Sequence, residues 1–65
     1  MVEKIGINAG KVWSILDSNG RMNVKDLRKE CKLTERDAFA AIGWLAKEGK
    51  LILEKELRDF YVELR

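Results

Sequence analysis

Hydrophobic positions in the first third of the chain recur with helical spacing. The run falls at i, i+3, i+4 and i+7, which is one face of an amphipathic helix, and consists of Ala9, Val12, Trp13 and Leu16. Asn8 is a favourable N-cap residue directly before this run, and the turn formers Asp-Ser-Asn-Gly at 17–20 follow it. The pattern therefore predicts a first helix that begins after Asn8 and closes at residues 17–20.

Gly10 lies in the first turn of this predicted helix. A glycine inside a helix costs about 1 kcal/mol relative to alanine. Such a cost is often accepted where another backbone must come close. The sequence therefore predicts a close approach of another segment at Gly10.

Two further helices are predicted in the middle of the chain. Asn23 can cap a helix over residues 24–31, whose apolar stripe is Val24, Leu27 and Cys31. Thr34, with an acidic residue three positions later, has the form of an N-terminal cap for a helix over residues 35–47. Gly49 supplies the C-terminal stop of this third helix.

After Gly49 the hydrophobic period changes from 3.6 to 2, which indicates strands. Leu51 and Leu53 alternate with Ile52 and Glu54, and a second alternating run covers residues 60–64. No Asn-Gly or Asp-Gly pair marks a two-residue turn between them. The pattern predicts a β-hairpin whose loop, near residues 56–59, is longer than two residues.

The order of three helices followed by a hairpin is typical of a winged helix-turn-helix, an α+β fold. The short extended piece around Met22 would supply the third strand, and residues 1–65 would form a single domain. One core then draws on every element, and its expected members are Trp13, Leu16, Leu27, Cys31, Ala38, Ile42, Leu45, Leu53, Phe60 and Val62.

Composition excludes several function classes. The 65 residues include no histidine and one cysteine, so neither a His-based catalytic triad, nor an ordinary metal cluster, nor an internal disulfide is possible. No apolar run has the length of a membrane span or a secretory signal. We expect a cytoplasmic, non-enzymatic domain with no metal, cofactor, membrane or small-molecule substrate. Cys31 is expected to be a small core residue, and a redox-sensing thiol beside Lys29 and Lys32 is the alternative.

Two stretches carry a family resemblance. Ile-Asn-Ala-Gly-Lys-Val-Trp at 7–13 and Ala-Ile-Gly-Trp-Leu-Ala-Lys-Glu at 41–48 resemble a family of small bacterial winged helix-turn-helix proteins of unknown function. With the pattern of Val24, Leu27 and Leu33 and the terminal hairpin, the similarity covers essentially the whole chain. The resemblance implies the fold and a presumed DNA-binding role, and it brings no functional residues to carry over.

The distribution of charge favours DNA binding. Residues 21–50 carry eight basic and five acidic side chains, a net charge of +3 within a total of +2. In the usual docking geometry helix 35–47 enters the major groove, so Arg36 and Lys47 would reach base edges or phosphates. The side chains expected to hold the phosphate backbone are Lys25, Arg28, Lys29, Lys32 and Lys50. We therefore predict a module that binds double-stranded DNA, a small transcriptional regulator or accessory factor.

A strip of small residues on the same helix leaves other interpretations open. The small residues Ala40 and Gly43, beside Trp44, would permit close approach to DNA, but they equally suit a protein interface. In a third interpretation Trp44 packs against the wing as part of the core, and Gly43 relieves crowding. Tyr61 and Ile52 would form an apolar sheet face, which would suit a homodimer. The alternative function is therefore a protein–protein or dimerisation module that uses Ala40, Gly43, Trp44 and Tyr61.

Overall fold

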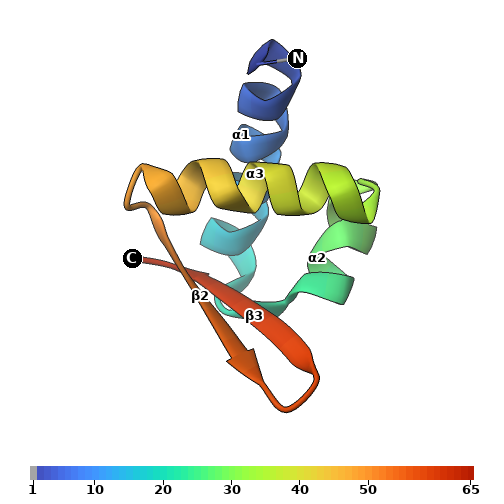
Figure 1. The fold of residues 1–65 in the computed structure, drawn as a ribbon, viewed down its shortest axis with the longest axis vertical. Coiled ribbons are helices and arrows are strands. Elements are labelled where there is room, and N and C mark those ends of the chain that lie inside the picture. The colour runs from blue at the N-terminus through green and yellow to red at the C-terminus, as the bar shows by residue number, and fades with distance from the viewer. Residues whose placement is uncertain (1) are drawn as a thin grey trace.

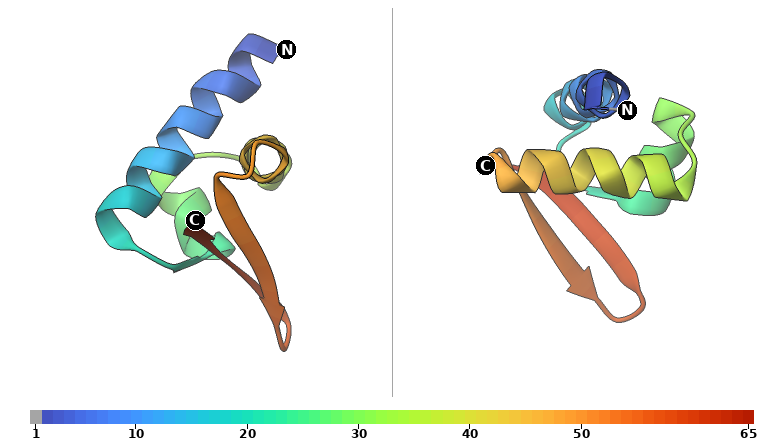
Figure 2. Two further views of the ribbon diagram at one scale, coloured as in Figure 1. Left: turned by 90° about the vertical axis from the view of Figure 1, so that its left-hand side faces the viewer. Right: turned by 45° about the horizontal axis from the view of Figure 1, so that its top comes forward.

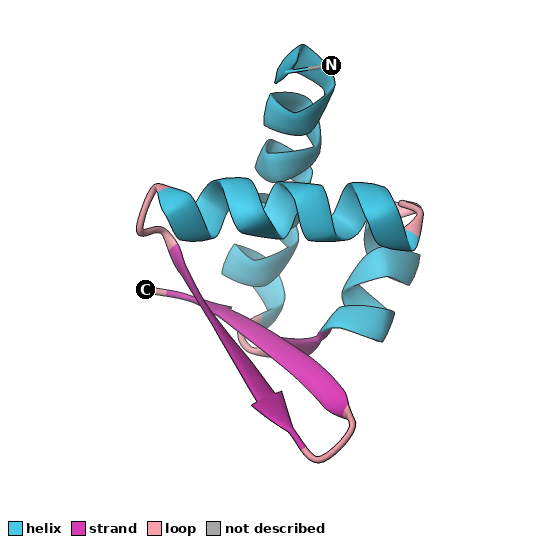
Figure 3. Cartoon of the chain, viewed as in Figure 1, coloured by secondary structure: helices cyan, strands magenta, loops and turns pink. Residues whose placement is uncertain are grey.

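Three helices cover a small antiparallel sheet in the computed structural model, which describes residues 2–65 (Figures 1 and 3). The elements in chain order are α1 (Val2–Asn19), β1 (Met22–Asn23), α2 (Val24–Cys31), α3 (Glu35–Lys47), β2 (Leu51–Glu56) and β3 (Asp59–Leu64). The α+β winged helix architecture predicted from the sequence is confirmed, with β2 and β3 as the wing.

The sheet has the order β1-β3-β2, so β3 is its central strand. Val62 pairs with Met22 of β1 on one side and with Leu53 of β2 on the other. The short strand expected near Met22 is therefore present, and it attaches the wing to the segment between α1 and α2. The far half of the hairpin extends away from the helices (Figure 2).

The first helix is longer than predicted. α1 begins at Val2 rather than after Asn8, and Asn8 lies inside the helix with its residue surface 5% exposed. Ile5 falls on the same helical face as Ala9 and Val12 and is half-buried, so packing extends the apolar stripe past the cap signal. The predicted end is confirmed: Gly20 has a φ of +76°, and its backbone N–H donates to the carbonyl of Leu16 at 2.8 Å.

The caps predicted for the next two helices are present. The Asn23 side chain accepts a hydrogen bond from the backbone N–H of Lys25 at 2.8 Å. The Thr34 hydroxyl accepts one from the backbone N–H of Asp37 at 3.2 Å. Gly49 ends α3 with a φ of +71°, a left-handed conformation that glycine adopts without a steric penalty. These local signals fix the bounds of both helices.

The core is built from aliphatic side chains. Its buried members are Ala9, Val12, Leu16, Val24, Leu27, Cys31, Ala38, Ala41, Ile42, Leu45, Leu51 and Val62. The prediction that Trp13, Leu53 and Phe60 belong to it is wrong, because they are 42%, 41% and 36% exposed. The helices bury the hairpin fully only near its base, at Leu51 and Val62, so Leu53 and Phe60 keep a large part of their surface exposed.

The wing turn also differs from its prediction. Glu56 pairs directly with Asp59, so only Leu57 and Arg58 form the loop. Leu57 has a φ of +55°, a conformation that glycine or asparagine usually occupies in such turns. Because a leucine takes this position, the ordinary sequence signal for a two-residue turn is missing.

Candidate nucleic-acid interface

The exposed strip of α3 follows from the burial of its opposite face. Ala38, Ala41, Ile42 and Leu45 are buried, and at about 100° per residue the opposite side carries Arg36, Ala40, Gly43 and Lys47. Arg36 and Lys47 are exposed and stand about 16 Å apart along the helix axis. A Cβ at Gly43 would meet no atom of the described chain within 4 Å. Ala40 is half-buried beside α1, so the strip is bare helix surface at Gly43, with a cation toward each end of the helix.

The strip and the wing lie on one side of the molecule. In the left view of Figure 2, α1 lies to one side of α3, and the wing extends below α3. The ring of Phe39 on α3 meets the ring of Phe60 on β3 edge-on, with centroids 5.7 Å apart. This contact connects the exposed recognition-type helix to the wing.

Some of the basic side chains in and next to α2 already form ion pairs with acids of this chain. The Lys25 ammonium lies 3.2 Å from a carboxylate oxygen of Asp59, and a guanidinium nitrogen of Arg28 lies 3.8 Å from Glu35. The Arg28 Nε is buried and has no hydrogen-bond partner in residues 2–65. Lys29 and Lys32 are exposed and belong to none of the ion pairs of the described chain. Two of the four basic side chains predicted to bind phosphate from this region, Lys25 and Arg28, are thus already paired with acids.

The four ion pairs share a property: each neutralises an acid of α3 or of the wing. Asp37 and Glu35 flank Arg36 on α3 and pair with Lys4 and Arg28. The wing acids Glu56 and Asp59 pair with Arg21 and Lys25 in the same manner. Arg36, which lies between these two acids, belongs to none of the ion pairs found within residues 2–65. The sequence places these acids near basic residues but gives no sign of the pairings, because they depend on the helix crossing and the strand register.

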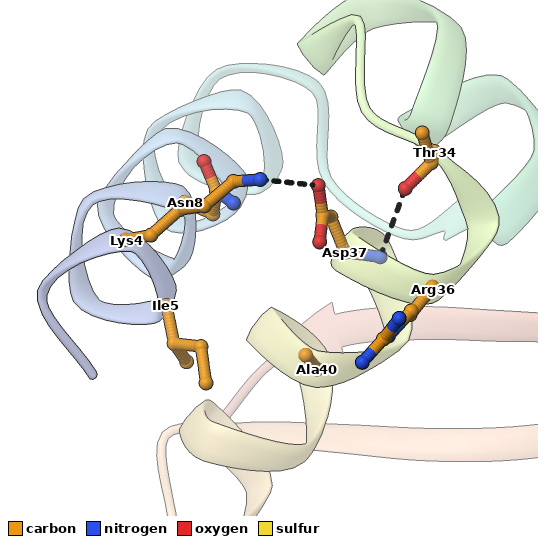
Figure 4. Close-up of a pocket in the computed structure, with 7 residues that line it drawn as sticks. All are labelled: Lys4, Ile5, Asn8, Thr34, Arg36, Asp37 and Ala40. Atoms are coloured by element: carbon orange, nitrogen blue, oxygen red, sulfur yellow. Dashed lines mark hydrogen bonds and ion pairs between the residues drawn. The ribbon is translucent and has the colours of Figure 1, made fainter. Parts of the chain in front are cut away.

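A hollow between α1 and α3 surrounds one of these pairs (Figure 4). It is lined by Lys4, Ile5, Asn8, Thr34, Arg36, Asp37 and Ala40. The Lys4 ammonium reaches the Asp37 carboxylate at 3.2 Å, and the backbone of Asp37 is held by Thr34. Within residues 2–65 no group of three or more His, Cys, Asp or Glu side chains is placed to hold a metal ion.

The wing has two chemically different faces, which follow from its register. Paired residues share a face of the sheet, so the outer face carries the alternate positions Ile52, Glu54, Glu56, Asp59, Tyr61 and Glu63. Arg21 lies over the ring of Tyr61 with its guanidinium carbon 4.4 Å from the ring centroid. On the inner face, the Lys55 ammonium lies 5.8 Å from the ring centroid of Phe60. The outer face is thus acidic, and its aromatic ring is covered by Arg21, a role that the sequence did not reveal.

Of the residues predicted for an alternative protein interface, Ala40, Gly43 and Trp44 are neighbours on α3, but Tyr61 on β3 lies apart from them. Tyr61 is half-buried and points to the opposite face of β3 from Phe60, which contacts α3. Trp44 is 37% exposed and lines a groove with α1, not the wing, so its expected packing as core against the wing is wrong. Lys50 lines that same groove, away from Arg36.

Cys31 is buried at the end of α2 as a free thiol. Burial raises its pKa above the ordinary thiol value, Lys11 opposes this shift, and Glu30 adds to it. A raised pKa is the opposite of what a reactive thiol requires. Of the residues described, no helix has both the length and the hydrophobicity to cross a membrane.

Comparison with known proteins agrees with this geometry. A family model described as "Winged helix-turn-helix domain (DUF2582)" matches residues 1–64. The solution NMR structure of protein BT2368 from Bacteroides thetaiotaomicron is similar, with a TM-score of 0.86 and 29% sequence identity; the match covers 95% of this chain and 76% of that one. No curated protein matches the chain.

Proposed function

We propose that this chain, which belongs to the winged helix-turn-helix family DUF2582, binds double-stranded DNA as a small, non-enzymatic transcriptional regulator or accessory factor. The observation that carries the proposal is the pattern of ion pairs. The acids beside the exposed strip of α3 and those at the wing tip are each held by a cation. This arrangement lowers the negative potential that would otherwise repel a phosphate backbone.

In the proposed complex α3 lies in the major groove. The bare surface at Gly43 allows the helix axis to approach the base edges. Arg36 can donate to guanine or to a phosphate, and Lys47 contacts phosphate at the other end of the strip. α3 contains no Asn, Gln or Ser, the other common readers of base edges. We therefore expect most of the affinity to come from phosphate contacts and sequence discrimination to be modest.

Backbone contacts in this complex come from α2 and the wing. Lys29 and Lys32 supply unpaired cations on α2, which suits the positioning role of phosphate contacts. The wing turns its inner face and tip toward DNA, with Lys55 and Arg58, because its outer face carries Glu54 and Glu63. We place the protein in the cytoplasm, since its single cysteine is a free thiol.

The test is a titration of the ¹⁵N-labelled protein with a random-sequence duplex, followed by amide NMR between about 50 mM and about 200 mM salt. We expect shifts on α2, on the start and exposed strip of α3, and at the wing tip, and these shifts should fade with salt. Arg36→Gln should weaken binding and reduce the salt slope by about one. Lys11→Gln removes the same charge from an exposed position on α1 and should have a smaller effect.

Two results would contradict the proposal. One is the absence of shifts at the lower salt concentration. The other is an equal loss of binding in the Arg36 and Lys11 variants, which would mean that net charge alone attracts the DNA and that α3 makes no specific contact.

A further inference from the structure

A groove lies between α1 and the C-terminal half of α3. Its lining consists of Gly6, Ala9, Gly10, Trp13 and Ser14 from α1 with Trp44, Leu45, Glu48 and Lys50. Trp13 is 42% and Trp44 37% exposed, although the core itself contains no aromatic side chain among the residues described. The chain thus places both of its tryptophans at one surface groove.

The two tryptophans are the large apolar side chains at this groove, and each keeps more than a third of its surface exposed. Ile7, three residues before Gly10 and therefore its neighbour on the helix surface, is 64% exposed. Exposed tryptophan is enriched where protein partners bind, so two tryptophans at one groove point to an interaction surface.

The glycines of α1 give the groove a bare wall. A Cβ at Gly6 or at Gly10 would meet no atom of the described chain within 4 Å. The close approach predicted at Gly10 is therefore not made by any segment of this chain that the structure describes. Each glycine nevertheless costs helix stability, about 1 kcal/mol relative to alanine. A surface that comes from outside the chain would account for both positions.

We propose that this groove binds a second copy of the chain, so that the protein acts as a symmetric dimer. A two-fold interface requires one patch to be complementary to itself. This groove meets the requirement in shape, because it holds both projecting indole rings and bare helix surface that can receive them. It also meets the requirement in charge, because Glu48 and Lys50 lie in the same patch and can pair reciprocally across the two-fold axis.

The size of the domain also favours a second copy of the chain as the occupant of the groove. A specific interface needs about 500 Å² from each partner, and the exposed tryptophans contribute to it. Domains of this length often gain stability by association, because a single small core contributes little. The outer face of the wing, where Tyr61 is covered by Arg21 and surrounded by glutamates, offers no comparable surface.

The proposal does not depend on DNA binding. Trp44 lies on the flank of α3 toward α1, whereas Arg36 and Lys47 lie on the outward strip. Substitutions at Gly10 in the groove and at Gly43 on the outward strip can therefore test dimerisation and DNA binding separately. Both Gly10 and Gly43 lie within helices and have open space at the Cβ position, so a leucine at either position is compatible with the fold.

The experiment measures the mass of the full chain by sedimentation equilibrium from about 10 µM to about 1 mM, a range that covers weak specific association. We expect the wild type to dimerise within this range. Gly10→Leu should fill the groove and weaken dimerisation by at least roughly tenfold, with an unchanged or higher Tm. Gly43→Leu should leave dimerisation unchanged and should weaken DNA binding, because it blocks the approach of α3.

Either of two outcomes would overturn the dimer. The first is a wild type that remains monomeric at the highest concentration, which would assign the groove to a different protein. The second is a Gly10→Leu variant that dimerises like the wild type while its circular dichroism shows it to be folded. Failure of DNA binding, by contrast, would appear as unchanged amide spectra on addition of the duplex and would leave the mass measurement unaffected.

Discussion

Arg21 lies over the ring of Tyr61, with its guanidinium carbon 4.4 Å from the ring centroid, and the same guanidinium pairs with Glu56. Tyr61 belongs to β3 and Glu56 to β2. One side chain from the segment between α1 and β1 therefore holds both strands of the wing. Arg21 thereby links the two strands of the wing to the segment that leads into β1.

Arg21→Gln should loosen the wing without unfolding the domain. It removes both the contact with the Tyr61 ring and the ion pair with Glu56, while no buried core residue changes. We expect faster amide exchange in the far halves of β2 and β3, with exchange in α1 and α3 unchanged. Tyr61→Leu should reproduce part of this effect, because it removes the ring but keeps the ion pair. Equal loosening of the helices would show that Arg21 supports the whole fold.

Leu57→Gly should stabilise the protein. Leu57 is 96% exposed and has a φ of +55°, so its side chain packs against almost nothing while its backbone takes a conformation costly for leucine. Glycine relieves about 1–2 kcal/mol of this backbone strain. Part of the gain is offset because glycine loses more conformational entropy on folding than leucine does. We expect urea unfolding to show a net gain of about 0.5–1 kcal/mol. Arg58→Gly, where φ is not positive, should destabilise the turn instead.

Leu27→Ala should cost far more stability than Trp13→Ala, despite the larger size of tryptophan. Leu27 is fully buried among the three helices, whereas Trp13 is 42% exposed at the groove. Removing Leu27 leaves a cavity and should lower the free energy of unfolding by about 2–5 kcal/mol. Urea unfolding well below the dimerisation range compares the two variants as monomers. A larger loss for Trp13→Ala would place that side chain in the core, where the sequence pattern alone puts it.

The free energy of unfolding should fall as the pH rises above about 9. Burial raises the pKa of Cys31 above its ordinary value of 9.0. The unfolded chain therefore loses this proton at a lower pH than the folded one, and stability is lost as the pH rises from the unfolded pKa toward the folded pKa. Cys31→Ala removes this contribution. The difference in unfolding free energy between wild type and variant should be constant from pH 6 to 8 and should shrink above pH 9; a constant difference across the whole range would contradict the raised pKa.

Local signals in the sequence were sufficient for the middle of the molecule. Asn23 and Thr34 cap their helices through bonds to residues two and three positions away, so the bounds of α2 and α3 depend little on the rest of the chain. The exposed strip of α3 was predictable for a similar reason, since the helical period places Arg36 and Lys47 opposite the buried stripe. Features of this kind are encoded within a few neighbouring residues.

Other features depend on contacts between distant residues and could not be predicted. Asn8 gives a cap signal, but packing of Ile5 against the rest of the fold continues the helix through it. Lys25 appears as a free cation in the sequence and is paired with Asp59 only because the wing folds back beside α2. Trp13 follows the apolar period and still lies at the surface, because aliphatic side chains from all three helices already fill the interior.

The position of β2 at the edge of the sheet has a consequence for the solubility of the protein. β3 is the central strand, so β2 has one edge with unpaired backbone groups. Open edges of this kind promote aggregation by adding strands from other molecules. The distal half of β2 reads Glu54-Lys55-Glu56, and charges at an edge oppose such growth. Strand addition is therefore discouraged at the open edge of the sheet.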